Sequence, residues 1–91
     1  MNINENNINN QPYQTSDLYA CTCLICKGFH LEKIVPEEGN SRRFIFIFKN
    51  ERNKEIRNVA DSFYNGEVKV SARDFVHAIR DLKSYINQNR N

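Results

Sequence analysis

The sequence has little of what a catalytic or cofactor-binding domain requires. Its 91 residues include three glycines, two prolines, one methionine and no tryptophan. Three glycines are too few for a loop that brings the backbone close to a phosphate, and no H-E-x-x-H or paired-carboxylate motif occurs. No apolar run approaches the roughly 20 residues that cross a bilayer, and no secretory signal opens the chain. We therefore expect a non-enzymatic cytoplasmic protein with no cofactor and no membrane contact.

The sequence also has no large excess of charge of one sign, and its number of cysteines is odd. Thirteen lysines and arginines are interleaved with eleven aspartates and glutamates, which leaves a net charge of +2. This balance is compatible with a nucleic-acid partner but does not require one. Three cysteines in a chain without a secretory signal indicate free thiols rather than a disulfide framework.

The chain divides by composition into a polar tail and a single domain. Residues 1–14 contain six asparagines and two glutamines, so we expect a disordered tail there. Residues 15–88 are expected to form one small α+β domain, and 89–91 a polar C-terminal end. A chain of this length buries only roughly 60–65% of its unfolded surface, which makes a homodimer a possible source of further stability.

The first half of the domain is predicted to be a helix followed by a β-hairpin. Thr15 or Ser16 is the expected N-cap of a helix that runs to residue 27, with Asp17 in its first turn and Gly28 as its stop. Residues 29–35 and 42–48 are predicted strands around the loop 36–41. In the second strand, phenylalanines alternate with isoleucines, so both faces of the strand require cover.

The second half changes to a helical period. Apolar residues recur at helical spacing from about residue 50, and the pair Asn65–Gly66 supplies a left-handed stop. Ser71 is the expected N-cap of a third helix, whose buried stripe is Phe75, Ile79, Leu82 and Ile86. The predicted order is therefore helix, strand, strand, helix, helix.

The segment "CTCLICKGFH" at 21–30 is the densest group of potentially reactive side chains. On one helix Cys21 and Cys23 point about 160° apart, so both cannot bind one ion. Structural zinc usually takes four ligands, and a second cysteine pair is missing. Thiols in the middle and at the end of a helix also lack the dipole that favours a thiolate. We interpret Cys21, Cys23 and Cys26 as small packing residues, with no metal and no catalytic residue.

Four segments carry a resemblance to a known group of proteins: "TSDLYACTCLICKGF", "RRFIFIF", "FYNGEVKVSARDF" and "AIRDLKSYI". They resemble an uncharacterised family of short bacterial, phage and mobile-element proteins, a domain of unknown function, over most of residues 15–86. The family pattern has alanine or other residues at the three cysteine positions, which favours the packing interpretation. The resemblance implies a non-secreted accessory protein and brings no established catalytic residues.

Basic residues suggest a first function, binding to nucleic acid. On the third helix, Arg73, His77 and Arg80 lie within about 60° of arc opposite the apolar stripe. A second basic group surrounds the second strand and its exit: Arg42, Arg43, Lys49 and Arg52. Such side chains can contact phosphates. A solvated charged face remains the alternative, because Asp74 and Asp81 flank the arginines of the helix.

The apolar second strand suggests a different function, binding to a protein. Its five central residues are the interface candidates Phe44, Ile45, Phe46, Ile47 and Phe48. They exceed what a lone hairpin with three short helices covers, which is typical of an adaptor or inhibitor that docks on a host or defence-system protein. Self-association is the alternative, with two hairpins pairing across a two-fold axis.

Overall fold

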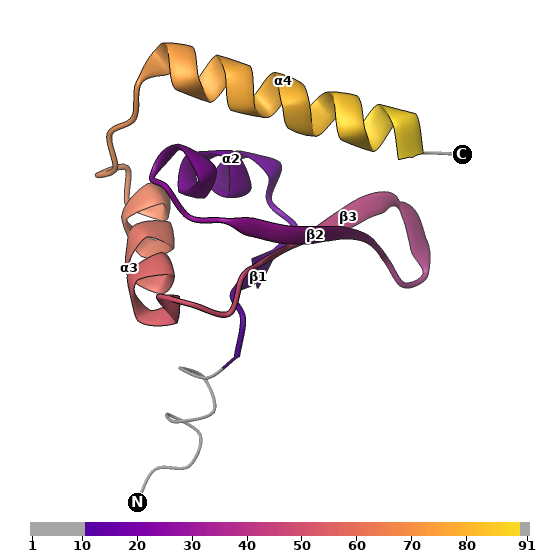
Figure 1. Cartoon of the computed structure of the whole chain (residues 1–91), viewed down its shortest axis with the longest axis horizontal. Helices are drawn as coiled ribbons and strands as arrows, with labels where there is room; N and C mark the ends of the chain where they lie inside the picture. Colours follow the sequence, from indigo (N-terminus) through magenta and orange to yellow (C-terminus); the bar gives the residue numbers. More distant parts are fainter. Residues whose placement is uncertain (1–10, 90–91) are drawn as a thin grey trace, which may run out of the picture.

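The computed structural model describes residues 11–89, which form one small α+β unit (Figure 1). A three-stranded antiparallel sheet is built from β1 (Gln14–Thr15), β2 (Leu31–Glu37) and β3 (Asn40–Phe48). Three helices complete the fold: α2 (Leu18–Cys26), α3 (Asn53–Tyr64) and α4 (Ala72–Asn89). The predicted order of helix, hairpin, helix and helix is confirmed, and β1 is an additional strand that the sequence did not predict.

The helix α2 begins later than predicted. Its N-cap is Asp17, whose Oδ1 accepts hydrogen bonds from the Tyr19 and Ala20 amides at 2.9 and 3.1 Å. The prediction of Thr15 or Ser16 as the cap was therefore wrong. Thr15 lies in β1 instead, and its hydroxyl accepts a hydrogen bond from the Asp17 amide. An aspartate cap of this kind contributes about 1 kcal/mol to helix stability.

The strand β3 lies at the centre of the sheet, in the order β1-β3-β2. On one side, β2 pairs with it through a tight turn at residues 38 and 39, so the hairpin loop is shorter than the predicted 36–41. On the other side, Gln14 and Thr15 pair with Ile47 and Phe46. Gln14 therefore belongs to the fold rather than to the predicted tail, whose residues 1–10 lie outside the described part of the chain.

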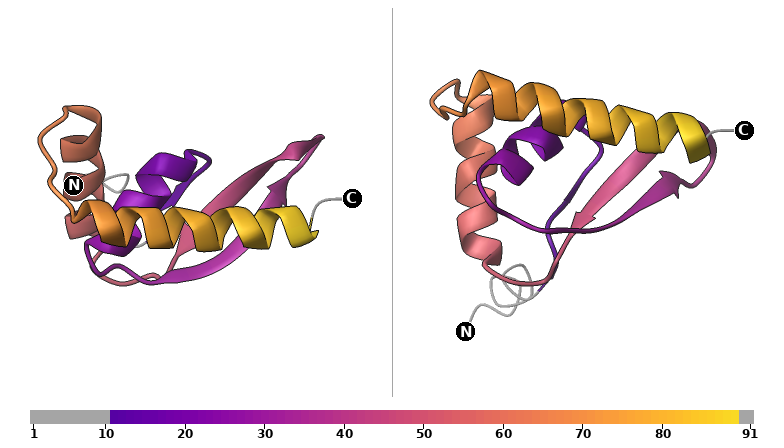
Figure 2. Two further views of the ribbon diagram at one scale, coloured as in Figure 1. Left: turned by 90° about the horizontal axis from the view of Figure 1, so that it is seen from above. Right: turned by 45° about the horizontal axis from the view of Figure 1, so that its top comes forward.

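The core lies between one face of the sheet and the helices. Phe46 and Phe48 are 2% and 0% exposed, and Phe44 is 8% exposed. They pack with Cys21 and Leu24 of α2, and further core residues come from the helices and loops: Phe29, Ile56 and Leu82. Figure 1 shows α4 and α2 on the same side of the sheet, and Figure 2 shows α4 crossing over both. Helices α2 and α4 thus cover the same face of the sheet.

Two helices end in the same glycine-dependent turn. At the end of α2 the Gly28 and Phe29 amides donate to the carbonyls of Ile25 and Leu24, and Gly28 has a φ of +95°. This double hydrogen bond with a left-handed glycine is the Schellman motif. The sequence predicted both stops, since α3 ends likewise at Gly66 with a φ of +75°.

The helix α4 begins at the predicted cap. The Ser71 hydroxyl accepts a hydrogen bond from the Asp74 amide at 3.3 Å. Its apolar stripe turns toward the core, where Leu82 is buried and Ile86 packs against the same cluster. Within residues 11–89, α4 included, no helix has the length and apolar character needed to cross a membrane.

Candidate binding surfaces

The cysteines lie on α2, the central helix of the fold. Five consecutive residues of this helix, Ala20–Leu24, are buried, so the middle of α2 is enclosed on all sides, whereas Tyr19 in its first turn is exposed. Small side chains at these positions let neighbouring elements approach closely, and Thr22 satisfies its hydroxyl by donating to the Leu18 carbonyl at 2.7 Å. Cys21 and Cys23 are 0% and 1% exposed. The packing interpretation of these two thiols is therefore confirmed.

Burial also suppresses the reactivity of the thiols. Desolvation raises the pKa of Cys21 to about 12, with a further contribution from the charge of Asp17. Desolvation likewise raises the pKa values of Cys23 and Cys26. A nucleophilic cysteine needs the opposite shift. Across residues 11–89 no group of three or more His, Cys, Asp or Glu side chains is placed to hold a metal ion, and exposed His30 contacts Glu51 at 3.1 Å instead.

The basic residues of α4 form an exposed row. Arg73, His77 and Arg80 all lie on the solvent side of the helix, as their spacing predicts. His77 also lines, together with the neighbouring Asp74 and Asp81, a shallow groove of about 340 Å³ between α4 and the end of α2. Positive charge on the outer row is thus bordered by negative charge along one side.

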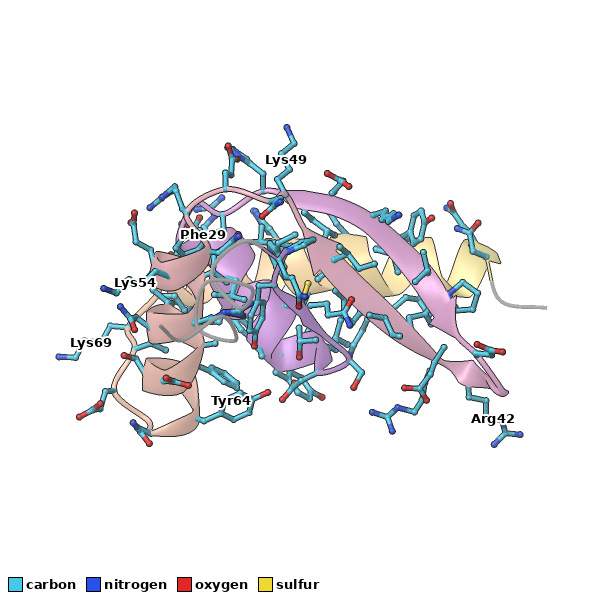
Figure 3. All side chains as sticks on the ribbon, turned by 90° about the horizontal axis from the view of Figure 1, so that it is seen from below. Phe29, Arg42, Lys49, Lys54, Tyr64 and Lys69 are labelled. Carbon is cyan, nitrogen blue, oxygen red and sulfur yellow. The ribbon has the colours of Figure 1, made fainter. Side chains whose placement is uncertain are left out.

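The basic residues of the strand do not form one group. Figure 3 shows Arg42 near the hairpin tip and Lys49 at the far end of β3. Arg43, next to Arg42, donates a hydrogen bond to Ser16 Oγ at 2.5 Å and lies 3.7 Å from Glu37. The four residues that the sequence grouped therefore lie at two ends of a nine-residue strand.

Arg52 has a structural role at the start of α3. Its backbone is in the left-handed region, with a φ of 54°, which is uncommon for a residue with a side chain. The guanidinium lies 4.5 Å from the ring centroid of Phe29 and donates to Glu55 Oε2 at 3.0 Å. These contacts hold the chain as it leaves β3, so Arg52 fits a packing role better than a phosphate-binding one.

The two faces of β3 have different environments. The interface candidates Phe44, Phe46 and Phe48 are buried under the helices, so the prediction that they form an accessible surface was wrong. Ile45 and Ile47 lie on the opposite, outer face and are half-buried. Side chains of a strand alternate between its two faces, so the phenylalanines lie in the core while the isoleucines lie on the outer face.

The outer sheet face, defined here by Val35, Ile45 and Ile47, is an apolar patch with a polar rim. Val35 is the cross-strand partner of Ile45, and Lys33 and Gln14 flank Ile47 on either side. Figure 3 views the sheet from this face, with α4 behind it. Sequence reasoning missed Val35 and Lys33, although the alternation in "EKIVPE" carries the signal.

The model of one family, described as Domain of unknown function (DUF5659), matches residues 10–88. The chain belongs to this family. The resemblance to an uncharacterised domain family is thereby confirmed at the level of the family. A search of curated proteins and a search of solved structures each found no match.

Proposed function

We propose that this DUF5659 chain is a small non-enzymatic binding protein of the phage or mobile-element type, which acts in the cytoplasm as an adaptor or inhibitor of a partner protein. The observation that carries the proposal is the outer sheet face. Helices α2 and α4 lie on the opposite side of the sheet (Figure 1), yet the centre of this face is apolar: Val35, Ile45 and Ile47. Apolar patches rimmed by polar residues are typical of protein interaction sites.

The free edge of the hairpin favours this face over strand-to-strand dimerisation. In β2 a register shift between Leu31 and Lys33 interrupts the regular ladder, and Pro36 lacks a backbone N–H. Bulges, prolines and charged residues on an edge strand oppose pairing with another edge. A homodimer formed through two β2 edges would have to pair across this interruption, so we place a partner on the outer face.

The variant Ile47→Lys tests this proposal. A lysine at the centre of the outer sheet face should abolish capture of the partner from a lysate of the source cells, because a charge would be buried in an apolar contact. Nuclease treatment of the lysate should leave the captured protein in place. The control is Val76→Lys, which adds the same charge to an exposed position of α4.

Three results decide the outcome of this capture experiment. Loss with Ile47→Lys alone, while circular dichroism shows an intact fold, supports the proposal. Equal capture by both variants contradicts it. If the partner of the wild-type protein is a second copy of the chain, sedimentation will show a dimer that Ile47→Lys dissociates, and the adaptor function is then replaced by self-association.

Nucleic-acid binding is the second candidate, and the exposed row Arg73, His77 and Arg80 favours it. If this row contacts phosphates, the double variant Arg73→Ala and Arg80→Ala should reduce the affinity for a 20-base-pair DNA about tenfold and lower the salt dependence of binding. Fluorescence anisotropy at several salt concentrations measures both quantities. An affinity unchanged by the double variant excludes this role for α4.

A further inference from the structure

The strand β3 has a free edge that lies beside β1. The short strand β1 ends at Thr15, whose partner is Phe46, and the chain then turns away into α2. β3 continues past this point to Asn40 at the hairpin turn. The part of β3 from residue 45 toward the turn therefore has a strand neighbour on its β2 side and none among residues 11–89 on its β1 side.

The backbone of Phe44 points toward this free edge. The Phe48 amide donates to the Tyr13 carbonyl at 3.0 Å, so the backbone groups of Phe48 face the β1 side. Because these groups alternate along a strand, Phe46 and Phe44 face the same side. The partner of Phe44 on β2 is Pro36, which has no N–H to donate, and this pairing agrees with the same orientation.

A groove of about 200 Å³ lies along this edge. Apolar side chains from three elements line it: Leu18 of α2, Phe44 and Phe46 of β3, and Ile86 of α4. The remaining lining residues are Ser16, Arg42 and Arg43, so within the described residues the lining contains two cations and no anion. Glu37 lies close by, 3.7 Å from the Arg43 guanidinium.

We infer that this groove binds an extended segment of a partner protein, with alternating acidic and apolar residues, as an added strand along β3. The inference rests on the proposed protein-binding function and names the chemistry of the partner. Phe44 supplies one backbone donor and one acceptor to the added strand. Side chains of an extended segment alternate between two faces, so apolar residues meet Leu18 and Ile86 while acidic residues meet Arg43.

Charge is the reason to choose an acidic segment. The Arg43 guanidinium donates a hydrogen bond to the hydroxyl of Ser16, which directly follows β1, so it reaches the free-edge side of β3, while its Nε lies 3.7 Å from Glu37 of β2. A carboxylate that enters along the free edge would meet the side of the guanidinium that now donates to Ser16, and arginine forms its strongest hydrogen bonds with carboxylates. A basic segment would instead place like charges next to Arg42 and Arg43.

The test uses the full chain and two fluorescein-labelled octapeptides, one alternating glutamate with valine and one alternating lysine with valine. The glutamate peptide should bind in fluorescence anisotropy, and the lysine peptide should bind at least tenfold more weakly. The double variant Arg42→Glu and Arg43→Glu should weaken the glutamate peptide at least tenfold. Its matched control is Arg73→Glu with Arg80→Glu, which makes the same change of charge on the outer face of α4.

Amide hydrogen exchange gives a second readout that needs no variant. In the free protein the Phe44 amide should exchange at least tenfold faster than the Phe46 and Phe48 amides, which face β1, and the glutamate peptide should slow it at least tenfold. Unchanged Phe44 exchange at saturating peptide, equal binding of both peptides, or equal weakening by both double variants would overturn the inference. If Ile47→Lys still abolishes partner capture in that case, the proposed function stands and only the groove assignment fails.

Discussion

Replacing Phe46 with alanine is expected to lower the free energy of unfolding by about 3–5 kcal/mol. Phe46 is 2% exposed and lies at the centre of β3, where its ring packs against residues of both the sheet and α2. Its removal takes away the apolar transfer free energy of the ring and leaves a cavity that the sheet and helix cannot close. Native proteins have a total stability of about 5–15 kcal/mol, so a domain at the lower end of this range will be close to unfolding at room temperature after the substitution.

The control for Phe46→Ala is the adjacent residue of the same strand. Ile45→Ala truncates a half-buried side chain on the outer sheet face and should cost less than half as much. Urea denaturation followed by circular dichroism measures both values. Equal losses would mean that the outer face is as well packed as the core, which contradicts the one-sided arrangement of the helices.

The second large effect is a loss of stability at high pH. In the unfolded chain the Cys21 thiol ionises near its ordinary pKa of 9.0, whereas burial keeps the folded thiol protonated up to a pKa of about 12. Ionisation therefore stabilises only the unfolded state between these values, and the stability of the fold falls as the pH rises. The slope from this one group is about 1.4 kcal/mol per pH unit, or about 2 kcal/mol between pH 9 and pH 10.5.

The variant Cys21→Ala isolates this contribution from that of other groups. Tyr13 and Cys23 also have raised pKa values, mainly through desolvation, and they persist in the variant. Urea denaturation at pH 8 and at pH 10.5 should show a loss of stability that is smaller in the variant by about 2 kcal/mol. Parallel losses in the two proteins would mean that the Cys21 thiol ionises in the folded state. Cys26→Ala, at a half-buried position, should change the pH dependence much less.

Local sequence signals predicted the helices and the hairpin well. Gly28 and Gly66 marked both helix ends, Ser71 marked the start of α4, and the spacing of Leu82 and Ile86 gave its buried side. These features depend on residues within one or two turns of each other. The predicted N-cap of α2 was wrong because Thr15, Ser16 and Asp17 are all good capping residues. The pairing of Thr15 with Phe46 places Thr15 in β1, and the Asp17 carboxylate accepts hydrogen bonds from the first helical amides.

Nonlocal pairing explains what the sequence did not reveal about the candidate sites. A strand of two residues is too short to show an alternation of apolar and polar side chains in the sequence. The position of β1, and of the free edge beyond it, is therefore set by pairing with residues of β3 more than 30 positions away. The grouping of Arg42 with Lys49 failed for a related reason, because an extended strand separates residues that are near each other in sequence.

The sequence by itself determined the family, the set of helices, the hairpin and the separation of phenylalanines from isoleucines in β3, because each of these follows from local spacing and composition. The tertiary structure decided which face of β3 is covered, that Cys21 and Cys23 are enclosed, and that a groove opens beside Phe44. The alternation of phenylalanine and isoleucine in the sequence shows that β3 has two different faces. Only the packing of α2 and α4 against one face determines which face remains available to a partner.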